Sequence, residues 1–519
     1  MRLICLILFS VVSIVLSKKI LVYVPQVGAS HDSFMARVGN ILHLAGYNVT
    51  VLIIPIDSEC VNQTKTLAHE IRLPLNNAFK GLDLNRKNDF ETFMWTYNMK
   101  NPIAGYFMIK YLTNTMVKQC EIVANDQTLH SYITDQKFDL MLFDGFDSCG
   151  YGLSNSWEIP NHIVVSSGLF QSPYFDYLNM GGLQISSTPD NGAYFSSGGH
   201  SMMDRFINYY SSFISNRLVD INMHYEEAIF KARDGDKHVD FSKRIEDMAY
   251  YITNGEPLLD YAHTITGKVI ELGGFTMEKF KELKDDEWDD LLNKRKWNVL
   301  ISFGTVAKSS KMPLEYKNNI LKAVKAMPYV SFIWKYEVED GLGDELDNLY
   351  KFNKVPQNDL LNDPRLSLFV SHGGLGSLQE SAYSGIPVIV IPLFGDQHRN
   401  AGILKKIGGK IFSKYDLSDF DKFIAAIGEI IDNIHLYKKR ALKTKKLLLG
   451  KPFNSTKLFI KYIEYTLKFG TIPILNLTKP KNNYDIYFAI SLLVSCAGIL
   501  FFKKTKSFKS LKSNTKKNE

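Results

Sequence analysis

Short apolar runs alternate with longer segments of mixed polarity along the first half of this chain. A segment at about 33–45 has the amphipathic pattern of a helix, and it separates two of the runs. Strands that alternate with helices predict a parallel sheet covered by helices. The predicted strands are Ile20–Pro25, Val49–Pro55, Leu140–Phe143 and Ile163–Ser166.

A second set of alternating runs opens at Val299 and predicts a second sheet. Its further strands are expected at Val330–Lys335, Leu366–Val370 and Pro387–Ile391, with a helix at Leu375–Ser384. Residues 276–297, between the two sets, are charged and helix-prone, which favours a linker region. Residues 60–130 and 170–240 are aromatic-rich and largely helical in pattern, and we interpret them as insertions on the first sheet. The chain is therefore expected to be an α/β protein with two domains.

Polar residues gather at the ends of two predicted strands in the segment 369–397. One strand leads into Ser371-His372-Gly373-Gly374 and a helix, and the next leads into Asp396-Gln397. In open α/β sheets, ligands bind at the carboxyl ends of the strands. Glycines let backbone N–H groups approach an anion, and a helix N-terminus favours a diphosphate. Glu380 can accept hydrogen bonds from the two hydroxyls of a ribose.

This segment resembles the UDP-glycosyltransferase family, which includes the glucuronosyltransferases. The resemblance rests on Phe369-Val-Ser-His-Gly-Gly, Ser377, Glu380, two prolines and Asp396-Gln397, all at the family spacing. It implies the GT-B fold, in which two Rossmann-like domains face each other across a cleft. The expected parts are a signal peptide at 1–17, an acceptor-binding domain at 18–275, a linker region at 276–297, a nucleotide-sugar-binding domain at 298–450, a return segment at 451–485, a transmembrane helix at 486–502 and a basic cytosolic tail at 503–519.

The first domain is expected to carry the acceptor chemistry. His31 is predicted in a loop after the first strand, and Asp144 follows another strand, so both are candidates for one sheet edge. An imidazole can deprotonate a hydroxyl near neutral pH, and a carboxylate can orient it. The resemblance implies the roles of catalytic base for His31 and partner for Asp144, with Asp147 as a competitor for the second role.

The second domain is expected to hold the nucleotide sugar. The resemblance implies that His372 faces the diphosphate, that Gln357 lies near uracil and ribose, and that Glu380 binds the ribose. The full set of expected donor-binding residues is Ser302, Thr305, Gln357, His372, Gly373, Gly374, Ser377, Glu380, Asp396 and Gln397. The expected reaction is inverting transfer of a hexose or glucuronate from a UDP-sugar to a hydroxyl of a small lipophilic acceptor, with no cofactor and no metal.

Two positions depart from the family pattern. Lys354 stands where the family usually has a tryptophan that stacks on uracil, and Gly376 stands where an asparagine often donates to phosphate. These departures favour an alternative, a membrane-anchored, non-catalytic binder of nucleotide sugars or lipophiles. A lumenal hydrolase of nucleotide sugars is a third reading. The glucose or glucuronate donor, the acceptor and the oligomeric state, a homo-oligomer included, stay open.

Both ends of the chain carry features of membrane targeting. Residues 1–17 have a basic residue, then a short apolar run and a small residue near the end of that run, as in a cleavable signal peptide. Residues 486–502 are uncharged, and 17 residues is the short limit for a membrane span. The lysines that follow place the tail in the cytosol, and Lys516-Lys517 resembles a dilysine retrieval signal. We therefore expect a single-pass protein of the endoplasmic reticulum membrane with a lumenal body.

Net charge supports this division and argues against a nucleic-acid partner. The chain carries +7, of which the last 17 residues, with seven lysines and one glutamate, supply +6.

Cys60, Cys120 and Cys149 allow at most one disulfide outside the two apolar ends. Asp234-Gly235-Asp236 matches a metal-binding pattern but reads as a surface turn. The expected glycosylation sites are Asn48, Asn62, Asn454 and Asn476.

Overall fold

The computed structural model describes most of the chain between the two apolar ends. The described residues are 18–26, 28–56, 65–76, 91–97, 102–170, 173–180, 201–278, 280–283, 286–478 and 491–493. The predicted signal peptide at 1–17, the tail at 503–519 and Asn62 lie outside this part, as does the predicted span at 486–502 except for 491–493. In the described part, no helix is long and apolar enough to cross a membrane.

The first sheet has seven strands, and every neighbouring pair in it is parallel. Its order is β3-β2-β1-β4-β5-β6-β7, so β1 lies between β2 and β4, and β5 lies next to β4. Because parallel strands end at the same edge, residues that follow β1, β4 and β5 are brought together. The strands are β1 (Lys19–Pro25), β2 (Asn48–Ile54), β3 (His69–Arg72), β4 (Leu140–Phe143), β5 (His162–Ser166), β6 (Tyr251–Thr253) and β7 (Val269–Glu271).

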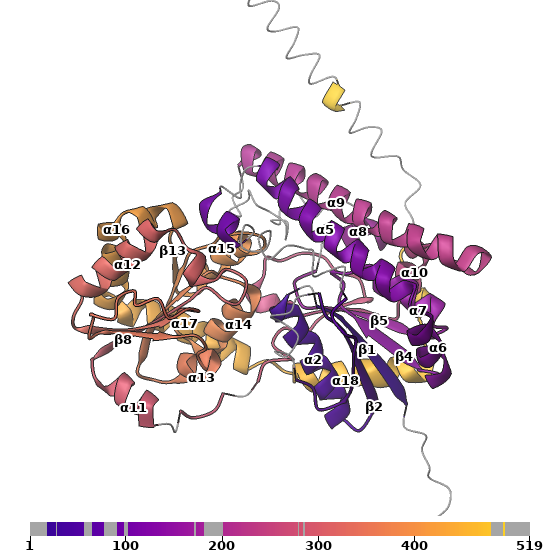
Figure 1. The fold of residues 1–519 in the computed structure, drawn as a ribbon, viewed down its shortest axis with the longest axis horizontal. Coiled ribbons are helices and arrows are strands. Elements are labelled where there is room, and N and C mark those ends of the chain that lie inside the picture. The colour runs from indigo at the N-terminus through magenta and orange to yellow at the C-terminus, as the bar shows by residue number, and fades with distance from the viewer. Residues whose placement is uncertain are drawn as a thin grey trace, which may run out of the picture. The chain divides into compact units, whose positions relative to one another are not determined.

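Alternate residues of β1 enter different hydrophobic cores, because side chains of a strand point to opposite faces. Leu21 and Tyr23 pack with helices α5 and α9 on one face, whereas Ile20 and Val22 pack with α2 and α18 on the other. Figure 1 shows α5 and α9 side by side over one face of this sheet. The helices of this part are α2 (Ala29–Leu44), α5 (Pro102–Ala124), α6 (Gln127–Gln136), α7 (Cys149–Ser156), α8 (Pro173–Tyr177), α9 (Met202–Asp234) and α10 (Phe241–Asp247), with short 3-10 helices at Gly235–Lys237 and Pro257–Leu259.

The second sheet has six parallel strands in the order β10-β9-β8-β11-β12-β13. One face packs on α12 and α16, and the other packs on α11, α13 and α14. The strands are β8 (Trp297–Ser302), β9 (Val330–Lys335), β10 (Leu349–Phe352), β11 (Leu366–Ser371), β12 (Val388–Val390) and β13 (Gly409–Ile411). The helices are α11 (Asp286–Asn293), α12 (Leu314–Ala326), α13 (Gln357–Asn362), α14 (Leu375–Ser384), α15 (Gln397–Ile407), α16 (Phe420–Asp432) and α17 (Ile434–Leu449), with 3-10 helices at Ser309–Lys311 and Lys414–Ser418.

After the second sheet, the chain returns to the first. Helix α18 (Ser455–Phe469) places Phe459 and Ile463 in the core under β1 and β2, and Phe459 packs on Phe275 with ring centroids 4.8 Å apart. Figure 1 shows this yellow helix beside α2. A 3-10 helix follows at Pro473–Leu475. Helix α18, which comes after the second sheet in sequence, therefore contributes to the core of the first sheet.

The expected two-sheet α/β architecture is confirmed, with local corrections. Helix α2 begins at Ala29 rather than near residue 33, so His31 lies in its first turn and not in a loop. Gly28 takes the N-cap position in extended conformation, which lets the helix start directly after β1. Strand β3 lies in a segment for which helices were expected, because its edge pairing with β2 overrides the local pattern. In the described part of 276–297, the helix is short, spanning Asp286–Asn293.

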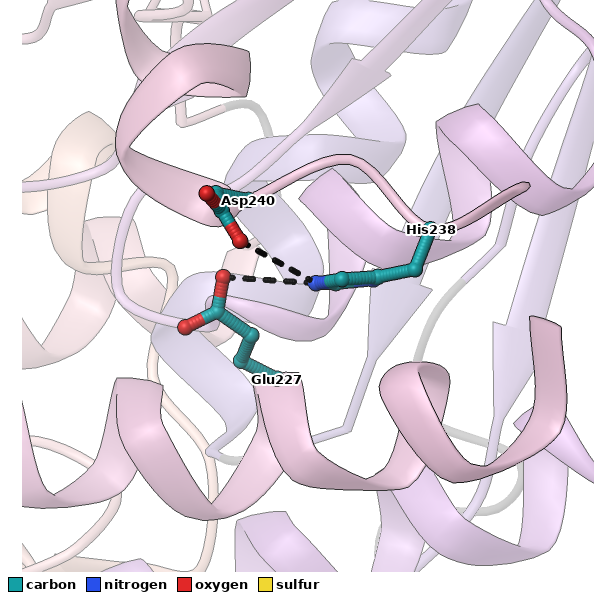
Figure 2. A group of neighbouring side chains, drawn as sticks. All are labelled: Glu227, His238 and Asp240. Atoms are coloured by element: carbon teal, nitrogen blue, oxygen red, sulfur yellow. Dashed lines mark ion pairs between the residues drawn. The ribbon is translucent and has the colours of Figure 1, made fainter. Parts of the chain in front are cut away.

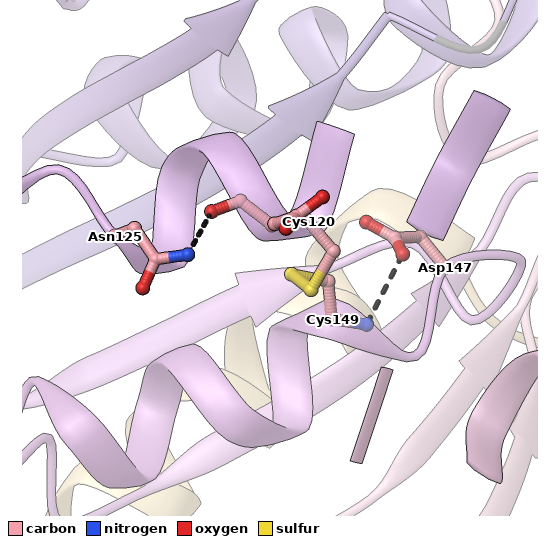
Figure 3. Close-up of a disulfide and its surroundings, with 5 residues drawn as sticks. Cys120, Asn125, Asp147 and Cys149 are labelled. Atoms are coloured by element: carbon pink, nitrogen blue, oxygen red, sulfur yellow. Dashed lines mark hydrogen bonds between the residues drawn. A yellow bond between two sulfur atoms is a disulfide. The ribbon is translucent and has the colours of Figure 1, made fainter. Parts of the chain in front are cut away.

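A disulfide joins Cys120 at the end of α5 to Cys149 at the start of α7. Figure 3 shows the bond between the two helices, with the Asp147 carboxylate accepting the Cys149 backbone N–H at 3.1 Å. Both cysteines are fully buried. The disulfide therefore fixes the start of α7, a few residues after Asp144, against the helical layer.

Candidate active site

His31, in the first turn of α2, contacts Asp144, which follows strand β4. Nδ1 of His31 lies 2.7 Å from Oδ2 of Asp144, although the residues are 113 positions apart. Asp144 follows β4 and is almost completely buried, while 30% of the His31 side chain remains exposed. The backbone N–H of Phe146 donates to the other Asp144 oxygen at 3.2 Å. The carboxylate is thus held in place, and the imidazole is partly open to a ligand.

Two further residues that sequence reasoning missed complete the surroundings of His31. The Ser167 hydroxyl lies 2.8 Å from the same Nδ1 atom, and the Phe146 ring centroid lies 5.1 Å from that of the imidazole. Ser167 directly follows β5, and β5 lies next to β4. A polar residue after a neighbouring parallel strand was the available signal for Ser167. No comparable signal pointed to Phe146.

The electrostatics around His31 favour its protonated form. Burial alone lowers the pKa of His31, but the adjacent Asp144 carboxylate, with Asp32 and Asp396, raises the pKa above its usual value. Burial raises the pKa of the neighbouring Asp32 to about 7, against an opposing effect of His31. A histidine with a raised pKa therefore lies beside a carboxyl group whose pKa is about 7, an arrangement that suits a site that accepts a proton.

Asp147, the competing candidate for the partner of His31, points elsewhere. Its carboxylate accepts the Cys149 N–H and lies in a buried cluster with Tyr23 and Glu226. Burial raises the pKa of Asp147 to about 7. Burial also raises the pKa of Glu226 well above its usual value, and the charge of Asp147 adds to this effect. Of the two candidate partners, Asp144 is therefore the one whose carboxylate contacts His31.

A network of hydrogen bonds connects four of the expected donor residues. The Ser302 hydroxyl donates to the Gln357 side-chain carbonyl at 2.8 Å, and the Gln357 amide donates to Glu380 at 2.6 Å. The same amide lies 3.4 Å from the Ser377 hydroxyl. Burial raises the pKa of Glu380, against the effect of the Gln357 hydrogen bond. These residues come from the end of β8 and from α13 and α14, so the second sheet has a polar network at this edge.

His372 follows β11, and its ring lies close to Gly374 in the same turn and to Gly304 after β8. A Cβ atom at Gly304 would stand 2.6 Å from the imidazole Cε1, and one at Gly374 would stand 2.7 Å from Nε2. Gly304 also has a φ of +79°, which side-chain-bearing residues rarely adopt. Burial, together with the charge of Lys335, lowers the pKa of His372 to about 4. The ring is therefore neutral at pH 7 and is packed against backbone that can face an anion.

Asp396 and Gln397 lie at the start of α15. Asn400 donates to Asp396 at 2.8 Å and to the Gly373 carbonyl at 3.0 Å, which connects this helix to the glycine turn. The side-chain oxygen Oε1 of Gln397 accepts the backbone N–H groups of Leu393 and Phe394 at 2.8 and 3.1 Å. Burial raises the pKa of Asp396, whereas Asn400 and the charge of His31 act against this. Because His31 and Asp396 each affect the pKa of the other, the polar edges of the two sheets interact electrostatically.

The remaining expected residues are less constrained. Thr305 and Lys354 are exposed, and the charge of Lys354 contributes to a lowered pKa of Lys335, for which burial is the main cause. Gly376 is exposed, and a Cβ atom there would meet nothing within 4 Å. Both departures from the family pattern therefore lie where a larger side chain has room.

The three described sequon asparagines lie near the surface of the chain. Asn48 and Asn454 are exposed, and the Asn454 carbonyl caps α18 by accepting the Lys457 N–H at 2.9 Å. Asn476 is half-buried and accepts a hydrogen bond from Lys268.

Of the predicted Asp-Gly-Asp pattern, Asp234 accepts a hydrogen bond from Ser156 and pairs with Arg233, while Asp236 is exposed. The two aspartates of this pattern therefore differ in their partners and in their exposure.

Comparison with known proteins identifies the family. The family described as UDP-glucoronosyl and UDP-glucosyl transferase matches residues 18–515. The chain is 29% identical over 500 residues to ugt-56 of Caenorhabditis elegans, provisionally named a UDP-glucuronosyltransferase, covering 93% of this chain and 91% of that protein. It is 22% identical over 510 residues to UDP-glucuronosyltransferase 3A1 of Xenopus laevis, covering 94% of each.

Solved glycosyltransferase structures share the fold. A UDP-glucosyltransferase from Polygonum tinctorium superposes with a TM-score of 0.58 at 15% identity, covering 87% of this chain and 98% of that one. UGT2 of Phytolacca americana, solved with UDP-2-fluoro-glucose and pterostilbene, gives a TM-score of 0.57 at 14% identity, covering 87% and 100%. These likenesses extend over both sheets. The chain therefore belongs to the UDP-glucuronosyl and UDP-glucosyl transferase family and is a UDP-glycosyltransferase, as its motifs predicted.

Proposed function

We propose that this protein transfers a hexose or glucuronate from a UDP-sugar to a hydroxyl of a small lipophilic acceptor, with inversion at the anomeric carbon. His31 Nε2 takes the proton of the acceptor hydroxyl while its oxygen forms a bond to the anomeric carbon. The bond from that carbon to the diphosphate oxygen breaks, and UDP leaves. Asp144 orients the ring through Nδ1 and stabilises the imidazolium. The single observation that carries this proposal is the 2.7 Å contact between His31 and Asp144.

In this proposal, the donor binds at the polar edge of the second sheet. Glu380 and Gln357 bind the ribose and uracil region, and the Ser302 hydroxyl supports Gln357. Neutral His372 and the amides around Gly373, Gly374 and Ser377, together with Thr305, face the diphosphate, where the start of α14 favours negative charge. Asp396 and Gln397 contact the sugar. No cofactor or metal is assigned to the reaction itself.

The acceptor class is inferred from the family and from two of its structural neighbours. The Phytolacca enzyme was solved with pterostilbene, and the Polygonum enzyme glucosylates indoxyl. Both molecules are small and aromatic. The Phe146 ring beside His31 offers an apolar contact for such an acceptor.

Replacement of the proposed base tests the reaction. His31→Ala should lower turnover by on the order of 100-fold or more, because proton transfer from the acceptor is lost. The full-length protein in microsomes is assayed with labelled UDP-glucose or UDP-glucuronate and a panel of phenols, and UDP binding is measured in parallel. His43→Ala, in the last turn of the same helix and exposed, is the control. Near-normal turnover in His31→Ala would exclude His31 as the base.

Lys354, which stands where the family usually has a tryptophan, gives a second test of the proposed donor site. If Lys354 faces uracil, Lys354→Trp provides a stacking surface, and UDP affinity should rise by roughly 1–3 kcal/mol at most. The control is Asn353→Trp at the exposed neighbouring position. Titration calorimetry with UDP compares the three forms. If none of them binds UDP and no sugar is transferred, the transferase proposal fails.

We also propose a lumenal location in the endoplasmic reticulum, with one membrane span at 486–502. The Cys120–Cys149 disulfide supports this, because disulfides persist in oxidising compartments. In sealed microsomes, protease should remove only a short C-terminal piece, and glycosidase should shift a body glycosylated at Asn48, Asn62, Asn454 or Asn476. Complete digestion of the body without detergent would contradict this topology.

A further inference from the structure

Three ligand-type side chains meet at the junction of α9 and α10, in a cluster that the proposed transferase mechanism does not use. Glu227 comes from α9, His238 from the connecting segment, and Asp240 from the position before α10. Figure 2 shows both carboxylates directed at the same ring nitrogen of His238. Nε2 lies 3.5 Å from Glu227 Oε1 and 3.8 Å from Asp240 Oδ1. The carboxylates thus converge on one imidazole nitrogen.

His238 is buried although it carries a polar nitrogen that makes no hydrogen bond. Its side chain is 7% exposed, and Nε2 has no hydrogen-bond partner among the described residues. A buried polar group without a hydrogen bond is unfavourable, so such a group points to a ligand. In the described part of the chain, no lysine or arginine pairs with Glu227 or Asp240. The cluster therefore holds two carboxylates and a coordinating nitrogen without a fixed cation.

The separations fit the coordination sphere of a small transition-metal ion. Zinc bonds of about 2.0–2.2 Å to nitrogen and oxygen place tetrahedral ligands about 3.4 Å apart. The two separations from Nε2 are slightly longer than this, and all three ligand atoms lie within 4.8 Å of one another. The Phe241 backbone N–H donates to Glu227 Oε1 at 2.6 Å and holds that carboxylate in place. Asp240 is largely exposed, so water can reach a fourth position.

A second cluster of similar composition shows the contrast. Asp260, His263 and Glu271 also lie close together. There, however, the Arg399 guanidinium pairs with Asp260, and the His263 ring engages Glu271 at 3.3 Å and the Tyr261 carbonyl at 2.8 Å. A fixed positive charge already occupies the place of a cation. Only the cluster at Glu227 lacks such a charge, again within the described residues.

We propose that Glu227, His238 and Asp240 bind one Zn²⁺ ion, with water as the fourth ligand. Imidazole with carboxylate oxygens suits zinc, whereas Ca²⁺ and Mg²⁺ prefer sets of oxygen ligands. The ion connects the C-terminal part of α9 to the start of α10, across a segment whose ligands are eleven positions apart in Glu227 and His238. Its role is structural, because the cluster belongs to the helical layer and not to the His31 edge.

The test measures zinc directly on the full-length protein in detergent. After incubation with ZnCl₂ and gel filtration, elemental analysis should find one more equivalent of zinc in the wild type than in His238→Gln or Asp240→Asn. Saturating Zn²⁺ should raise the melting temperature of the wild type by a few degrees, because a ligand that binds only the folded state stabilises it. Co²⁺ should give the visible absorption of a tetrahedral site in the wild type, and this absorption should be absent from His238→Gln and Asp240→Asn.

Asp236→Asn is the matched control, since Asp236 is an exposed carboxylate in the same segment. It should retain the extra zinc and the thermal shift. Asp240 is largely exposed, so Asp240→Asn should fold normally even if the buried His238→Gln does not. Equal zinc content in the wild type and in Asp240→Asn, or equal loss in Asp236→Asn, overturns the proposal and leaves the cluster as an ion pair.

Discussion

At the scale of single residues, the electrostatic surroundings of His31 set the conditions for proton transfer. Asp144 touches the ring, and Asp32 and Asp396 also favour the charged form. Each of these carboxylates raises the pKa of His31, the proposed base, which can accept a proton only when it is neutral. We therefore expect a dependence of activity on pH that reports on this group of charges.

The first prediction concerns this pH dependence. If neutral His31 is the base, as proposed, kcat/KM should rise with pH through a midpoint above 6.5, the ordinary pKa of histidine. Asp144→Asn removes a negative charge that raises this pKa, so the midpoint should move to lower pH. Turnover should also fall by on the order of 100-fold, because the imidazolium loses its partner. Initial rates across pH 5.5–9 measure both effects.

The control for this prediction is Asp139→Asn. Asp139 precedes β4, whereas Asp144 follows it, and Asp139 pairs with Lys18 at 2.7 Å. Its replacement should leave the midpoint in place. A midpoint that does not move in Asp144→Asn would mean that Asp32 and Asp396 dominate the titration.

The second prediction concerns the glycines beside His372. Gly304→Ala places a Cβ atom 2.6 Å from the ring in a left-handed backbone conformation. It should lower the free energy of unfolding by about 1–3 kcal/mol and weaken UDP binding, because the ring must move. Gly376→Ala, where a Cβ atom has room, should leave stability unchanged or slightly higher. Thermal unfolding and UDP titration of both variants test this, and equal effects would contradict it.

At the scale of elements, the helical layer over the first sheet depends on a few long-range connections. The Cys120–Cys149 disulfide joins α5 to α7, and the Asp147 carboxylate accepts the N–H of the second cysteine. Because α7 follows Asp144 by a few residues, this connection supports the end of β4. Loss of the disulfide should therefore lower the stability of the protein directly and its activity indirectly, through the position of Asp144.

The third prediction measures the disulfide. The disulfide closes a loop of sequence separation 29 and so restricts the unfolded chain. Reduction opens this loop and raises the entropy of the unfolded chain, so it should lower the free energy of unfolding by about 3–4 kcal/mol. Urea unfolding with and without dithiothreitol gives this difference. The Cys120→Ala/Cys149→Ala double variant should unfold more easily and show no further response to dithiothreitol. A wild type that is insensitive to the reductant, although thiol labelling proves reduction, would contradict this prediction.

At the scale of the whole molecule, buried polar contacts connect segments of the two sheets. The Gln379 amide donates to the Asn254 carbonyl, and Lys451 pairs with Glu256 at 2.6 Å. Arg399 of α15 pairs with Asp260, and its guanidinium lies 5.0 Å from the Tyr261 ring centroid. These contacts fix the helix that begins with Gln397 relative to the first sheet.

The fourth prediction concerns the Asp260–Arg399 pair, whose side chains are 2% and 3% exposed. Arg399→Met leaves a buried carboxylate without its cation and should lower the free energy of unfolding by about 3–5 kcal/mol. Asp260→Leu/Arg399→Met removes both charges and should recover much of this loss. Urea unfolding compares the variants, and KM for the UDP-sugar shows whether α15 has moved. A double variant as unstable as the single one would contradict the charge argument.

The sequence alone determined the features that depend on local chemistry. The apolar runs of β1, β4, β9 and β11 identify strands, because a buried parallel strand excludes polar side chains from most of its length. Polar residues directly after several predicted strands indicated the sheet edge at which open α/β sheets generally bind ligands. The spacing from His372 to Gln397 indicated the family, since a diphosphate site needs its glycines and helix start at fixed positions.

Only the tertiary structure decided which distant residues meet. The order of strands brings Ser167 to His31 and separates Asp147 from it, because side chains after neighbouring strands converge and a shift of three residues changes the direction of a carboxylate. Packing of the elements also decided three further contacts. They are the pairing of Cys120 with Cys149, the return of α18 to the first sheet and the contact of Glu227 with His238. Contacts between residues far apart in the chain depend on packing, and local sequence patterns carry no record of it.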